Sequence, residues 1–135
     1  MDQASDTLAL GVNAIDREHH ALMSLIAKFI AYLKAEADAE VALAALREAI
    51  MAGNAHMEHE EELMAQSDYP GAEEHKLHHR TARLNYTTLM SDVFAFQAHD
   101  PALLEQSARI EAMLQHHISG PDRQFAEYLK ARGVN

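Results

Sequence analysis

The chain has 135 residues, no cysteine, and 21 acidic against 11 basic residues, which gives a formal net charge of -10. The missing cysteines exclude disulfides and thiolate metal sites, and an acidic chain without a lysine and arginine cluster is a poor partner for nucleic acid or an anionic membrane. No apolar segment reaches membrane-spanning length and the N-terminus lacks the pattern of a signal peptide. We therefore expect a cytoplasmic protein with a single domain, residues 1–135.

Composition and hydrophobic spacing both predict an all-α fold. Alanine, leucine and glutamate are abundant, whereas the chain contains only five glycines and three prolines. Apolar side chains recur every three or four residues in four stretches, with buried faces over residues 19–33, 43–64, 75–96 and 103–129. We expect the first helix to begin at Asp16 as its N-cap and the fourth to begin at Asp100 and Pro101.

The connections between these helices are short, which favours antiparallel neighbours. The expected fold is an antiparallel up-down-up-down four-helix bundle. Residues 1–14 are expected to form an extended N-terminal arm.

Histidine is unusually frequent, with ten in the chain, and most occur in close pairs. Residues four apart share one face of a helix, which pairs His56 with Glu60 and His75 with His79. Both pairs continue an apolar face. A lone histidine on such a face is usually a hydrogen-bonded structural residue, so the argument depends on whether several helices direct imidazoles to one place.

In an antiparallel bundle, the candidate ligands of all four helices come to the same end. They are His19, His56, Glu60, His75, His79, His117 and Asp122. Burying five imidazoles and two carboxylates together is costly without a cation, so we predict a metal site. Seven nitrogen and oxygen ligands imply two ions and suit iron, although manganese, cobalt, copper and zinc remain possible. A metal-free bundle or a zinc module is the simpler alternative.

Three segments, "GVNAIDREHHAL", "HMEHEEELMAQSDYPGAEEHKLHH" and "MLQHHISGPD", resemble the signatures of hemerythrins, in particular the single-domain bacterial hemerythrins. The resemblance implies two iron ions joined by a hydroxo or oxo bridge. It makes His75, His79 and His117 ligands of one iron, and His19 and His56 ligands of the other. Glu60 and Asp122 would bridge the two.

The resemblance also implies a function, which is reversible binding of O2 as a hydroperoxide at the open position of one iron. The expected O2 pocket is apolar and is formed by Met57, Met113, Leu114 and Ile118. Methionine occupies two positions, 57 and 113, where the family commonly has an aromatic residue and a tryptophan, so this pocket should be less rigid.

The spacing of His117 and Asp122 departs from a regular helix. Residues five apart are about 140° out of alignment on an α-helix. Because Pro121 has no N–H and Gly120 relaxes the backbone, we predict a wide turn or π-bulge that brings Asp122 back to the site. The alternative is that Gly120 and Pro121 end the helix and leave Asp122 outside.

The glutamates beside the second-helix ligands, at positions 58, 61 and 62, are expected to form a solvated acidic face. A further possibility is that one of them accepts a hydrogen bond from a ligand histidine.

Three functions are consistent with the sequence. The first is an oxygen carrier, storage or supply protein, which would act as a monomer with O2 as its ligand. The second is a di-iron enzyme that reduces peroxide or O2 with an unknown electron donor, and the third is a sensor of oxygen or iron. All three need the same metal ligands.

Overall fold

The computed structural model describes residues 9–95 and 100–135. Their helices are α2 (Asn13–Lys34), α3 (Ala39–Gln66), α4 (Ala72–Ala95), α5 (Pro101–His117), a π-helical turn η1 (Ile118–Asp122) and α6 (Arg123–Ala131). The described residues contain no strand. The expected N-terminal arm lies mostly outside them, as does Phe96 at the end of the third apolar face.

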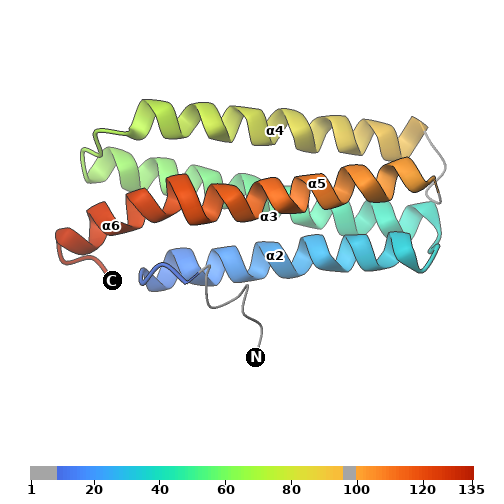
Figure 1. Cartoon of the computed structure of the whole chain (residues 1–135), viewed down its shortest axis with the longest axis horizontal. Coiled ribbons are helices and arrows are strands. Elements are labelled where there is room, and N and C mark those ends of the chain that lie inside the picture. The colour runs from blue at the N-terminus through green and yellow to red at the C-terminus, as the bar shows by residue number, and fades with distance from the viewer. Residues whose placement is uncertain (1–8, 96–99) are drawn as a thin grey trace.

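The long helices form an antiparallel bundle, as the sequence predicts. Figure 1 shows successive helices running in opposite directions, with α6 continuing the line of α5. Helix α2 packs against α3 and α5, and α4 packs against the same two helices. The beginnings of α2 and α4 therefore lie at the same end as the later parts of α3 and α5. None of the helices described is long and apolar enough to cross a membrane.

The buried apolar residues form two clusters along the bundle axis. The larger one fills the centre of the bundle and includes Leu22, Met57 and Tyr86. The smaller one includes Ile15, Met64 and Phe125. The predicted ligands interrupt this sequence of apolar layers, because His19 comes between Ile15 and Leu22 on α2. The polar site thus lies between two layers of buried apolar side chains.

The beginning of α2 differs from the prediction. The helix begins at Asn13, with Val12 as its N-cap, so Asp16 lies in the first turn rather than at the cap. Its carboxylate instead accepts hydrogen bonds from the backbone N–H groups of Leu10 and Gly11, at 2.8 and 3.0 Å. The prediction failed because an acidic side chain in the first turn can reach back to preceding N–H groups as well as cap from in front.

The predicted irregularity between His117 and Asp122 is confirmed. Residues Ile118–Asp122 form a π-helical turn that contains Pro121, and the N–H of Arg123 reaches the carbonyl of Ile118, five residues back. A π-helical turn adds one residue without ending the helix. Asp122 is consequently fully buried, and α6 continues beyond it with Phe125 and Leu129 in the core.

Replacing Asp16 with alanine tests the anchoring of residues 10 and 11. We expect Asp16→Ala to lower the free energy of unfolding by about 1 kcal/mol, because two backbone N–H groups lose their acceptor. Asp38→Ala is a matched control, since Asp38 is the N-cap of α3 but its side chain makes no capping hydrogen bond. Urea denaturation of both variants measures the difference, and equal effects would contradict the assigned role of Asp16.

Candidate metal centre

The structure brings all seven predicted ligands together at one end of the bundle. One comes from α2, two from α3, two from α4, one from α5 and one from η1, namely His19, His56, Glu60, His75, His79, His117 and Asp122. Six of them are buried, and the side chain of His117 is 18% exposed. The helix periodicity therefore identified the residues that converge in space.

Asp122 is the centre of one half of this cluster. Its Oδ1 lies 2.9 Å from Nε2 of both His75 and His117, and its Oδ2 lies 2.9 Å from Nε2 of His19. A single carboxylate therefore contacts imidazoles from α2, α4 and α5. The π-helical turn makes this contact possible, because it places Asp122 on the same side as His117.

Glu60 is the second shared carboxylate. Its Oε1 lies 3.0 Å from Nε2 of His79, 3.2 Å from Nε2 of His75 and 3.5 Å from Nε2 of His56. The Nε2 atoms of His56 and His19 are themselves 3.1 Å apart. Every one of the five imidazoles thus directs Nε2 toward the space between the two carboxylates.

These atoms form two overlapping groups, within each of which all ligand atoms lie within 4.8 Å of one another. The first group is Glu60, His75, His79, His117 and Asp122, and the second is His19, His56, Glu60 and Asp122. The two groups share only the carboxylates. Such an arrangement provides three imidazoles for one ion, two for another, and two carboxylates common to both.

The pattern of unsatisfied atoms fits bound cations. Among the described residues, the buried side-chain nitrogen and oxygen atoms without a hydrogen-bond partner are His19 Nδ1, Glu60 Oε2, His117 Nε2 and both carboxylate oxygens of Asp122. All belong to the predicted ligands, and one of them, His19 Nδ1, is the ring nitrogen that does not face the two carboxylates. Buried polar atoms are normally hydrogen-bonded, and their concentration here indicates partners of another kind. Imidazole and carboxylate together suit a transition-metal ion such as iron.

The buried carboxylates and imidazoles of the cluster shift one another's pKa values. Burial opposes ionisation of Asp122, yet the contacting imidazoles of His117 and His19 hold its pKa well below the usual range. Burial also opposes charge on His75, but its close contacts with the carboxylates of Asp122 and Glu60 raise the pKa of His75 to about 9. Protons therefore occupy positions that a metal ion would take over, so metal binding must displace them.

Two further glutamates orient the ligand histidines from outside. Glu18 accepts a hydrogen bond at 2.8 Å from Nδ1 of His56 and contacts Nδ1 of His59 at 2.7 Å. Glu61 contacts Nδ1 of His79 at 3.1 Å and accepts a hydrogen bond from Arg83 at the same distance. A carboxylate on the distal nitrogen fixes the ring and leaves Nε2 free to bind a metal.

The role of Glu61 was among the possibilities that the sequence offered, but Glu18 was missed. Glu18 lies next to His19 and outside the apolar face of α2, so helical periodicity predicts that its side chain is exposed to solvent. The available signal was the spacing of His56 and His59, three residues apart on one side of α3. A carboxylate that contacts both had to come from a neighbouring helix.

The remaining described histidines, at positions 20, 59, 78 and 116, lie at the edge of the site or at the surface, as their positions on the helices predict.

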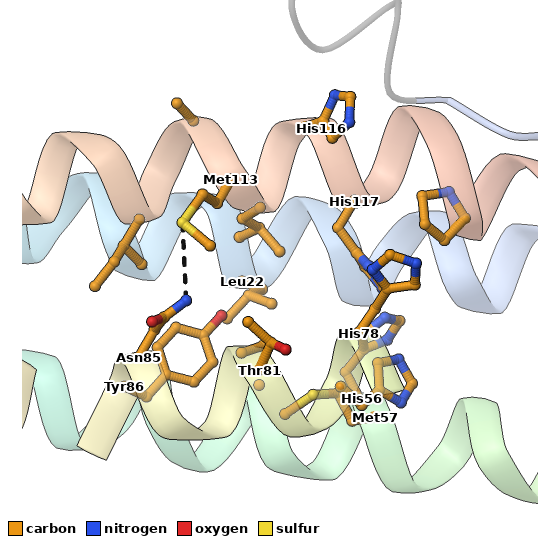
Figure 2. Close-up of a pocket in the computed structure, with 17 residues that line it drawn as sticks. Leu22, His56, Met57, His78, Thr81, Asn85, Tyr86, Met113, His116 and His117 are labelled. Atoms are coloured by element: carbon orange, nitrogen blue, oxygen red, sulfur yellow. Dashed lines mark hydrogen bonds between the residues drawn. The ribbon is translucent and has the colours of Figure 1, made fainter. Parts of the chain in front are cut away.

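A cavity of about 450 Å³ adjoins the metal cluster between α4 and α5. Met57, Met113 and Leu114 line it, as expected for the predicted O2 pocket, together with the ligands His56, His79 and His117 (Figure 2). Ile118 is not among the lining residues, because the π-helical turn directs it into the smaller apolar cluster. The pocket is open to solvent at Met113, whose side chain is 48% exposed.

A family model described as the hemerythrin HHE cation binding domain matches residues 10–129 of the chain. The matched segment contains every ligand of the cluster and extends from the residues before α2 into α6. The chain belongs to this family, which is described as a cation-binding domain. No curated protein and no solved structure gave a match in the corresponding comparisons.

The raised pKa of His75 predicts how the metal-free protein responds to pH. A histidine whose pKa is higher in the folded than in the unfolded state stabilises the fold fully below its unfolded pKa of about 6.5. That contribution is lost as the pH rises through about 9. We therefore expect the metal-free protein to be less stable at pH 9.5 than at pH 6, as measured by urea denaturation. His75→Gln should reduce this difference, and an unchanged difference would contradict the assignment.

The contact between Glu18 and His56 predicts an effect on metal affinity. We expect Glu18→Gln to weaken metal binding roughly tenfold to a hundredfold, because a neutral amide holds the imidazole less firmly and makes it a poorer donor. Glu58→Gln is the control, since Glu58 is an exposed glutamate on the same helix as His56. Competition with a chelator measures both affinities, and equal values for the two variants would rule out the proposed role.

Proposed function

We propose that the protein binds two iron ions and uses them to bind O2 reversibly, as an oxygen carrier, storage or supply protein. The observation that carries the proposal is the pair of overlapping ligand groups that share Glu60 and Asp122. Imidazole and carboxylate ligands suit iron, and two groups with shared carboxylates suit two adjacent ions.

In this proposal His75, His79 and His117 hold one ion and His19 and His56 hold the other, with both carboxylates shared. When bound, a pair of ferrous ions supplies the two electrons that reversible O2 binding requires. The ion held by His19 and His56 has one imidazole fewer than the other ion, and therefore fewer protein ligands.

The surrounding residues support this function in two ways. Glu18 and Glu61 hold two of the ligand imidazoles in orientation through hydrogen bonds to their distal nitrogens. The apolar side chains of Leu22 and Met57 form the wall beside the ligands and limit the access of water and protons. Restricting the access of water and protons keeps bound oxygen from oxidising the iron irreversibly.

A second candidate is a di-iron enzyme that reduces peroxide or O2. The observation that favours it is the mouth of the cavity, where Met113 is 48% exposed and His116 is also exposed. A small oxidant and protons can reach the site through such an opening. The two functions differ in turnover, because an enzyme consumes a reductant continuously whereas a carrier releases O2 unchanged.

The test is iron content together with oxygen binding. We expect the reduced protein, prepared without air, to contain about two irons per chain and to gain a visible absorption band in air that disappears under vacuum. Glu60→Ala should lose at least one iron and the reversible band, because both ions lose a shared ligand. Glu58→Ala, which removes an exposed glutamate from the same helix, should retain both.

Two results would contradict the proposal. One is a wild-type protein that holds a single zinc ion. The other is a di-iron protein whose spectrum changes irreversibly in air while it consumes an added reductant, which would favour the enzyme.

A further inference from the structure

The cavity beside the metal cluster is much larger than O2 requires. Its volume is about 450 Å³, and a water molecule, which is similar in size to a diatomic gas, has a share of roughly 30 Å³ in the liquid. O2 would therefore fill less than about a tenth of the space. A volume of this order is typical of sites for small organic ligands.

The walls of the cavity are mostly apolar, apart from five histidines at positions 56, 78, 79, 116 and 117. Leu22, Met57, Ala82, Ile110 and Leu114 contribute from all four long helices. None of the lining residues is an aspartate, glutamate, lysine or arginine. Such a lining favours a neutral and largely apolar molecule, because a charged one would be desolvated without a partner.

The hydroxyl of Tyr86 faces the apolar part of this space. Tyr86 is 6% exposed, and Figure 2 shows its hydroxyl pointing into the cavity. The hydroxyl makes no hydrogen bond within the part of the chain that the structure describes, and it is not one of the fully enclosed polar atoms because it opens onto the cavity. Burial raises the pKa of Tyr86 to about 12, so the hydroxyl keeps its proton and can donate it in a hydrogen bond.

A glycine helps to keep the space open. Gly53 lies inside α3 and lines the cavity, where a Cβ atom would approach Tyr86 Cε2 at 3.4 Å and Leu22 Cδ1 at 3.6 Å. Glycine inside a helix is less stable than alanine by roughly 0.5–1 kcal/mol. The chain therefore has its smallest residue where a side chain would narrow the cavity beside Tyr86.

At the mouth, a polar contact joins the two helices that border the cavity. The Nδ2 atom of Asn85 on α4 lies 3.7 Å from the sulfur of Met113 on α5, as the dashed line in Figure 2 shows. Both side chains are partly or largely accessible to solvent. Methionine is flexible enough to move aside for an entering molecule.

From these observations we infer that the cavity binds a small, neutral, mostly apolar organic molecule with one hydrogen-bonding group, which pairs with the hydroxyl of Tyr86. The size of the cavity, its mostly apolar walls and the hydroxyl of Tyr86 all define the same class of ligand. This site goes beyond the proposed O2 binding, and its occupant lies next to the ligands His56, His79 and His117.

The experiment uses 2-naphthol as the probe and naphthalene, which lacks the hydroxyl, as its analogue. Equilibrium dialysis against the protein as purified, with iron content matched between variants, measures retention of each compound. We expect the wild-type protein to retain both and Tyr86→Phe to bind 2-naphthol about fivefold more weakly, with its affinity for naphthalene unchanged.

A second variant tests the location. Ala82→Phe should weaken binding of both compounds about tenfold or more, because the phenylalanine ring occupies the cavity. Ala108→Phe makes the same replacement at an exposed position of α5 outside the lining, and it should change neither affinity. Circular dichroism establishes that both variants are folded, and the Tyr86→Phe comparison remains informative if Ala82→Phe is not.

Three results would overturn the inference: no retention of either compound by the wild-type protein, equal retention by Ala82→Phe, or an equal loss of both compounds in Tyr86→Phe. The measurement reads retention of the probe rather than uptake of O2. A failure here therefore leaves the proposed function standing, and a failure of reversible O2 binding leaves this site intact.

Discussion

Two buried carboxylates determine the arrangement of this protein. Glu60 and Asp122 are both fully buried, and between them they contact five imidazoles that come from all four long helices. Removing so many polar groups from water is strongly unfavourable unless their charges and lone pairs are matched. The helices must therefore meet at this level in one register, and the site acts as a constraint on the whole bundle.

The fold meets that constraint with ordinary helix packing and one irregular turn. Apolar layers on both sides of the cluster hold the helices in place, and Glu18 and Glu61 orient two of the ligand histidines. The irregular turn, η1, adds the single residue that aligns Asp122 with His117 and still lets α6 return its apolar face to the core. The need to place Asp122 beside His117 thus accounts for the π-helical turn between α5 and α6.

Much of this could be predicted from the sequence because both the fold and the ligands follow helical periodicity. The four apolar faces, their antiparallel order and the convergence of seven ligands all depend on spacings of three and four residues. Features that depend on tertiary contacts or on local backbone geometry could not be predicted from this spacing. Glu18 supports His56 from another helix, Asp16 reaches backward to Leu10, and Ile118 turns away from the cavity once the π-helical turn is formed. The size of the cavity and the free hydroxyl of Tyr86 also required the packed structure.

The central claim is that two metal ions share Glu60 and Asp122, and X-ray absorption at the iron edge tests it most directly. The account predicts nitrogen and oxygen neighbours around each iron and a second iron within about 4 Å. The same spectrum of an Asp122→Ala protein should lose the iron neighbour. An iron surrounded only by light atoms in the wild-type protein would contradict a shared centre and leave a single ion among structural histidines.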